Sequence, residues 1–147
     1  MKILRSFALL AAFSLTAFAG GLYLEITNGT SGALLTARVT SCHEPAKSVV
    51  TANLVTIVDG QLKRQAIAVA PVANQPGMFA ITGQLPSTNV VVELGVTNPE
   101  FKNYEPKVLI HAASGKVQVA SKKHFFSVGP TLADYRQALE GGATFTD

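Results

Sequence analysis

Residues 49–70, VVTANLVTIVDGQLKRQAIAVA, decide the fold of this chain. Two apolar runs rich in β-branched residues, at 49–58 and 62–70, flank the pair Asp59-Gly60. An Asp-Gly pair suits a two-residue type I′ turn, because both central residues of that turn need a positive φ. The segment therefore predicts a β-hairpin with two long arms.

Short runs of the same kind continue on both sides of this hairpin. Gly, Pro, Asn and Asp separate them at intervals of roughly 8–12 residues, the spacing typical of a β-sandwich. Helices do not alternate with the runs, which argues against a parallel α/β sheet. We therefore expect an all-β fold, an antiparallel Ig-like β-sandwich of seven to eight strands with a short C-terminal helix. Its further strands are predicted at 22–27, 33–40, 78–84, 90–97 and 107–112, with a weaker one at 116–120.

The one predicted helix lies near the C-terminus. Thr131 and Asp134 have the spacing of a capping box, with Asp in place of the usual Glu. Leu132, Tyr135 and Leu139 follow as an apolar stripe, and a Gly-Gly pair is a natural helix end. We expect this helix to pack on the sandwich; the alternative is a tail that folds on a partner.

Residues 1–19 have the layout of a secretory signal peptide. Two basic residues precede a short apolar run, which ends in the small-x-small pattern of Ala17 and Ala19. The run is shorter than the about 20 residues that span a bilayer. We expect cleavage to release residues 20–147 as one domain, periplasmic or secreted and without a transmembrane span. An uncleaved signal anchor is the alternative.

Charge and motifs argue against several classes of function. The net charge is +3, and no run of Lys and Arg is longer than two residues. The sequence therefore lacks the basic patch that nucleic acids and anionic membranes require. It also lacks a P-loop, an H-E-x-x-H and a G-x-S-x-G motif. We expect a protein that is not an enzyme, has no cofactor and does not bind nucleic acid.

A candidate metal site lies in the polar stretch around Cys42, the single cysteine of the chain. Thiolate and imidazole are good copper and zinc ligands, so Cys42 and His43 could bind a metal if the chain turns at Pro45. Alternatively, Cys42 is a buried core thiol or pairs with a second chain, and His43 is a loop residue. His111, in an apolar strand, is expected at an edge or partly buried. His124 follows two lysines, which disfavours a metal there.

Phe101 and Tyr104 are the candidate binding residues. They belong to the polar loop at 98–104, and exposed rings on a loop often recognise protein or sugar. The alternative is that both rings cap one end of the sandwich core, because aromatic residues dominate small cores.

Residues 59–97 resemble small exported bacterial Ig-like domains. The shared pattern is a hairpin, Pro-Gly-Met-Phe at 76–79, a short strand, Leu-Pro at 85–86 and a hydrophobic strand at 90–96. FixH/YtkA-like domains and copper-resistance sandwiches are similar in this stretch. The resemblance implies an Ig-like fold and export. It implies no copper site, because Gly20 stands where the copper-resistance sandwiches have a histidine.

Three hypotheses of function follow from these observations. The leading one is an exported non-enzymatic interaction or accessory module that binds another envelope or secreted protein. It would use a strand edge, the loop of Phe101 and Tyr104, or the C-terminal segment. The alternatives are a periplasmic copper or zinc protein using Cys42 and His43, and a carbohydrate-binding module using Phe101 and Tyr104.

Overall fold

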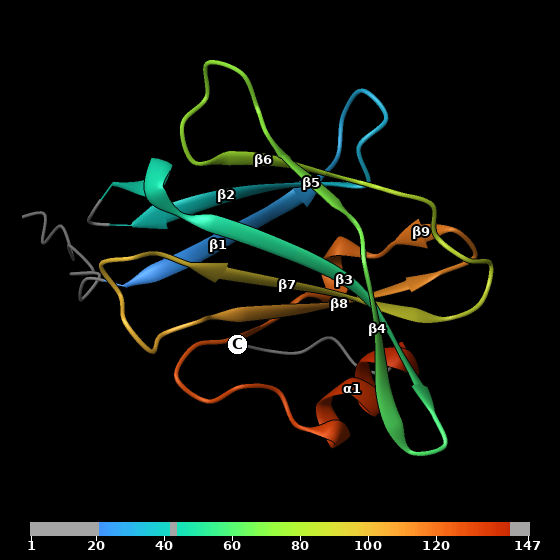
Figure 1. The fold of residues 1–147 in the computed structure, drawn as a ribbon. Coiled ribbons are helices and arrows are strands. Elements are labelled where there is room, and N and C mark those ends of the chain that lie inside the picture. Colours follow the sequence, from blue (N-terminus) through green and yellow to red (C-terminus); the bar gives the residue numbers. More distant parts are fainter. Residues whose placement is uncertain (1–20, 42–43, 142–147) are drawn as a thin grey trace, which may run out of the picture.

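The computed structural model describes residues 21–41 and 44–141, which form ten strands in two antiparallel sheets. The strands are β1 (Leu22–Asn28), β2 (Leu35–Ser41), β3 (Val49–Val58), β4 (Gln61–Ala66), β5 (Ala68–Pro71), β6 (Met78–Thr82), β7 (Val90–Thr97), β8 (Lys107–Ala113), β9 (Lys116–Val117) and β10 (Lys123–Phe125). Sheet A has the order β1-β2-β6-β5, and sheet B has the order β10-β8-β7-β3-β4, with β9 beside β8. The sheets pack face to face (Figure 1), which confirms the predicted all-β sandwich.

The strand order is that of an Ig-like sandwich. An Ig sandwich places its strands A, B, E and D in one sheet and C, F and G in the other. Sheet A matches the first set in the order β1, β2, β6 and β5, and sheet B matches the second with β3, β7 and β8. Strand β4 extends sheet B beyond β3, and the α-helix α1 (Leu132–Leu139) packs on the outer face of this sheet.

The predicted turn joins β3 to β4. Asp59 has a φ of 52° and Gly60 a φ of 75°, and all of β4 pairs with β3. The single second arm predicted at 62–70 is wrong, because the chain leaves sheet B after Ala66 and enters sheet A as β5. Ile67 lies at this crossover, where its half-buried side chain packs against the main core. Burial of this side chain between the sheets favours the crossover over a longer hairpin.

Both faces of sheet B are buried. The inner face packs against sheet A and forms the main core, with Leu94 and Ile110 fully buried. The outer face carries a second apolar cluster, in which Val91 lies under Tyr135 and Ala138 of α1. Figure 1 shows α1 on the side of sheet B that faces away from sheet A. The central strand β7 is therefore covered from both sides along all but its last residue.

The predicted capping box begins α1. The Asp134 amide donates to the Thr131 hydroxyl at 3.3 Å, and the Asp134 carboxylate accepts from the Thr131 amide at 2.8 Å. The helix packs on the sandwich, as expected. The predicted stripe was only partly right: Tyr135 and Ala138 are the buried residues, whereas Leu132 and Leu139 are half-buried.

Two short segments between β8 and α1 differ from the prediction. The weak strand expected at 116–120 is shorter, because β9 stops at Val117 and the 3-10 turn η2 (Val119–Ser121) follows. Strand β10 was not predicted, because three residues are too few to show an alternating pattern.

The predicted signal peptide at 1–19 lies outside the described residues. Within the described ranges, no helix is long and apolar enough to cross a membrane.

Candidate functional site

The predicted metal residues Cys42 and His43 lie outside the described residues. Among the residues that the structure does describe, no group of three or more His, Cys, Asp or Glu side chains is placed to hold a metal ion. His111 is buried within β8, so the expectation of an edge or partly buried position was wrong. Its Nδ1 lies 2.8 Å from the carbonyl oxygen of Ala138. The carbonyl is at the end of α1, so this contact fixes the helix to sheet B.

Phe101 and Tyr104 lie at one end of the sandwich. Both are half-buried and pack against the main core, with ring centroids 6.4 Å apart and ring planes tilted by 48°. The buried amide of Asn98 supports their loop by donating to Ser48 Oγ at 3.0 Å and to the Glu44 carbonyl at 3.2 Å. This placement corresponds to rings that cap the core, the alternative that the sequence left open.

The outer edge of β1 in sheet A is covered. His124 Nε2, on β10, lies 2.9 Å from the carbonyl oxygen of Leu24 and so bridges β1 to the neighbouring edge of sheet B. The His124 ring stacks on Tyr23 at 4.8 Å, and Phe126 lies parallel to both rings. A second chain that added to β1 would have to displace this histidine.

The edge of β5 is obstructed in a different way. The Val72 amide donates to the Met78 carbonyl at 2.8 Å, which places the even-numbered backbone groups of this segment toward β6. Val69 and Pro71 therefore direct their backbone outward, and proline has no N–H to donate. Only one full pair of outward donor and acceptor, at Val69, remains on β5.

The edge of β4 is open. The Ile67 amide donates to the Ala52 carbonyl at 3.0 Å and continues the β3–β4 register, so the odd-numbered residues of β4 bond to β3. Leu62, Arg64 and Ala66 consequently direct their backbone N–H and C=O groups outward. Among the described strands, β4 pairs with β3 alone. This edge can therefore accept a further strand.

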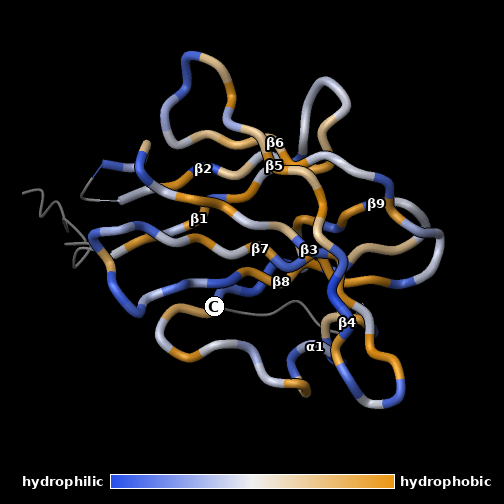
Figure 2. Tube along the Cα trace, in the orientation of Figure 1, coloured by the Kyte–Doolittle hydropathy of each residue, from blue (hydrophilic) through white to orange (hydrophobic). Residues whose placement is uncertain are grey.

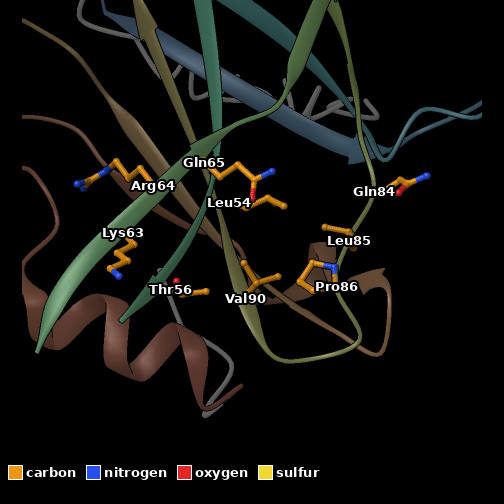
Figure 3. A pocket seen from close by; sticks show the side chains of 9 residues that line it. All are labelled: Leu54, Thr56, Lys63, Arg64, Gln65, Gln84, Leu85, Pro86 and Val90. Carbon is orange, nitrogen blue, oxygen red and sulfur yellow. The ribbon is translucent and has the colours of Figure 1, made fainter. Parts of the chain in front are cut away.

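A groove of about 540 Å³ lies beside β4 on the side that faces sheet A. Its size falls within the range of ligand-binding clefts, and it can equally receive side chains of a bound segment. Arg64 also belongs to the lining, but its guanidinium is directed away from the groove toward Glu93, whereas apolar side chains from three segments converge on the groove (Figure 3). The apolar lining consists of Leu54, Leu85, Pro86 and Val90, and the polar lining includes Lys63, Gln65 and Gln84.

On the opposite side of β4, Arg64 reaches a polar cluster beneath α1 that surrounds the buried carboxylate of Glu93, while the Arg64 side chain itself stays 39% exposed. Its Nε donates to Glu93 Oε1 at 2.9 Å and its Nη2 to Glu93 Oε2 at 3.1 Å, a bidentate pair. The Tyr135 hydroxyl donates to Glu93 and accepts from Arg64 Nη2 at 2.9 Å, and Asn53 donates to Glu93 at 3.3 Å. Glu93 is only 3% exposed. The cluster connects the edge strand, the centre of sheet B and α1.

Each ionisable group of this cluster keeps its ordinary charge state at neutral pH. Burial by itself raises the pKa of Glu93, but hydrogen bonds from Arg64 and Tyr135 and the charge of Lys107 outweigh burial and keep that pKa below its usual value. Burial and the neighbouring carboxylate raise the pKa of Tyr135, and the carboxylate raises the pKa of Arg64. None of the three shifts brings a group toward neutral pH, so the cluster suits a structural clamp better than proton transfer.

Arg64 and Glu93 were not predicted as site residues, and Tyr135 was predicted only as part of the apolar stripe of the helix. They lie on three elements that are far apart in the sequence, and no spacing rule joins them. One signal was present: Glu93 is the single charge in the apolar run 90–96, and a charge in a doubly buried strand needs a partner.

Geometry thus defines the candidate site as the open edge of β4 with its adjoining groove. No family model, curated protein or solved structure matches this chain.

Proposed function

We propose that this chain is an exported, non-enzymatic interaction module that binds an extended segment of another envelope or secreted protein at the β4 edge. In strand addition, main-chain hydrogen bonds supply affinity and side-chain pockets supply specificity. The outward backbone groups of Leu62, Arg64 and Ala66 are the observation that supports this proposal most directly. The adjoining groove offers the pocket.

The other edges favour β4 by comparison. His124 covers β1, Pro71 interrupts β5, and β10 has only three residues. Strand β4 offers six residues in regular register, anchored through the hairpin and through Arg64 to the centre of the sheet. An edge that is already ordered loses little conformational entropy when a segment binds, which favours affinity.

The charged residues of β4 favour selective rather than nonspecific strand pairing at this edge. Figure 2 shows the chain changing from hydrophilic in β4 to hydrophobic in β5. Charged side chains on an edge strand discourage pairing with unrelated strands. We infer that β4 accepts a particular segment, while the exposed charge of Lys63 protects the edge from aggregation.

A cross-linking experiment tests the proposal. A photoreactive amino acid replaces Gln65 in the full chain, which is expressed in the cell that produces it, and cross-linked peptides are identified by mass spectrometry. We expect one exported protein to be captured through a single extended segment.

The variant Ala66→Pro supplies the control for the mode of binding. It removes an outward N–H without removing a β3–β4 hydrogen bond, so the fold should persist, whereas Ala66→Val keeps the N–H. We expect the cross-link to vanish in Ala66→Pro and to remain in Ala66→Val. A cross-link of equal yield in both variants, or none in the original chain, would overturn strand addition at β4.

A further inference from the structure

We infer that the segment bound at β4 carries an acidic residue opposite Lys63 and an aliphatic residue opposite Gln65. This inference rests on the proposed function and adds the chemistry of the partner. It is drawn from the charges, the register and the groove beside the edge strand.

The two basic residues of β4 differ in how their charge is compensated. Arg64 points toward α1 and is neutralised by the bidentate contact with Glu93. Lys63 is exposed, borders the groove and forms no ion pair within the described ranges of the chain. No carboxylate lines the groove. An approaching segment therefore meets one uncompensated positive charge, and an acidic side chain is its complement.

The hydrogen-bond register of β4 determines which position of the bound segment holds the acidic side chain. The outward groups of Leu62, Arg64 and Ala66 would form the hydrogen-bonded pairs with an added strand. Residues opposite Lys63 and Gln65 then fall in the non-hydrogen-bonded pairs, where side chains on one face approach most closely. Both point to the face that holds the groove, because successive side chains alternate across a strand.

The groove determines which kind of side chain fits opposite Gln65. Gln65 is paired with Leu54, and Leu54 is part of the apolar lining together with Leu85 and Val90. A side chain opposite Gln65 is directed into this lining, where an aliphatic group replaces water. Every described strand pair of sheet B is antiparallel, and we take the added strand to follow this pattern. The partner sequence then reads aliphatic, any residue, acidic, from N- to C-terminus.

Titration of the full chain with synthetic extended peptides tests this chemistry. The acidic probe carries Val-Thr-Glu at its centre, the basic probe carries Val-Thr-Lys, and a third probe is the acidic one with an N-methylated threonine. Binding and hydrogen-exchange protection of the Leu62, Arg64 and Ala66 amides are followed by NMR at low ionic strength. We expect the acidic probe to bind about three- to tenfold tighter than the basic one and the N-methylated probe to lose binding.

Charge reversal supplies the matched variants. In Lys63→Glu we expect the preference to invert, so that the basic probe binds tighter, because the cross-strand pair changes sign. Lys102→Glu makes the same change on an exposed loop residue outside β4 and should leave the preference unaltered. A probe with Ser in place of Val should bind more weakly if the groove takes an aliphatic side chain.

The outcomes separate this inference from the proposed function. Equal affinity for acidic and basic probes, with the edge amides protected by both, would overturn the acidic preference and leave strand addition intact. Absence of binding by every probe would overturn the partner chemistry, while the Ala66-dependent cross-link would still decide strand addition. Equal binding of the Val and Ser probes would overturn the aliphatic position.

Discussion

The two faces of sheet B are both buried, but by different means. On the inner face, apolar side chains of β7, β8 and β3 pack against sheet A. On the outer face, α1 covers a smaller apolar cluster together with the ionic contacts of Glu93, Arg64 and Tyr135. The inner face is stabilised by the burial of apolar surface, whereas the outer face also depends on the geometry of a few charged hydrogen bonds.

Adjacent residues of β7 carry this difference. Leu94 points inward and Glu93 outward, and both are almost completely buried. Apolar burial is insensitive to pH, whereas a buried carboxylate is destabilising once its ionic partner is removed. We therefore expect the two faces to respond differently to substitution and to acid.

The largest effect is expected for Arg64→Met. The substitution leaves the Glu93 carboxylate buried without its strongest partner, which costs about 3–5 kcal/mol of unfolding free energy at neutral pH. Urea denaturation measures this loss, with an unchanged m-value showing that the transition remains comparable. Arg64→Lys keeps the charge but not the bidentate contact and should lose less. A loss below about 1 kcal/mol would mean that the outer face does not depend on the ion pair.

Leu94→Ala probes the inner face. Truncating a completely buried leucine leaves a cavity and is expected to cost about 2–5 kcal/mol. Unlike the deficit of Arg64→Met, which should shrink once acid protonates Glu93, this deficit should be the same at pH 7 and at acidic pH. Parallel pH dependence in the two variants would remove the distinction between the faces.

Tyr135→Phe tests the outer face more finely, because it removes only the hydroxyl that contacts Glu93 and Arg64. The ring still packs on Val91, but Glu93 loses a donor and Arg64 loses an acceptor, at a cost of about 1.5–3 kcal/mol. Tyr104→Phe, at one end of the sandwich and outside the cluster, is the matched control, and we expect it to change stability by less than about 0.5 kcal/mol. Equal effects in the two variants would argue against a special role of the cluster.

Acid should loosen the outer face first. The folded-state pKa values of Glu93 and Asp134 lie below their usual values of 4.5 and 3.8, so each group stabilises the fold above its ordinary pKa. That contribution falls as the pH drops through the lowered folded-state values. In Glu93→Gln the slope of stability against pH should flatten, as measured by denaturation between neutral and acidic pH. An unchanged slope would assign the acid sensitivity elsewhere.

The smallest effect is expected for Thr131→Ala. Loss of the capping hydroxyl should cost about 1 kcal/mol and speed hydrogen exchange in α1 before it affects sheet B. Thr27→Ala, at an exposed position of β1, is a suitable control. Loss of inner-face protection in parallel with α1 would mean that the two faces unfold as one unit.

Local interactions explain which elements the sequence predicted well. The Asp59-Gly60 turn and the Thr131–Asp134 capping box depend on φ preferences and on side chains within a few residues of each other. Alternating and apolar runs likewise indicated the main strands. These features arise from chain segments no longer than one element or turn, so the sequence alone is sufficient to predict them.

Tertiary structure decided the features that make the candidate site. The crossover at Ile67, the covering of β1 by His124 and the ion pair of Glu93 with Arg64 join residues from different elements. Whether Leu62, Arg64 and Ala66 face a neighbour or an open edge depends on which strands pair, and that is set by the packing of the whole sandwich. Sequence therefore determined most of the strands, the hairpin turn and the helix cap, whereas the open edge depends on the long-range contacts that order the strands.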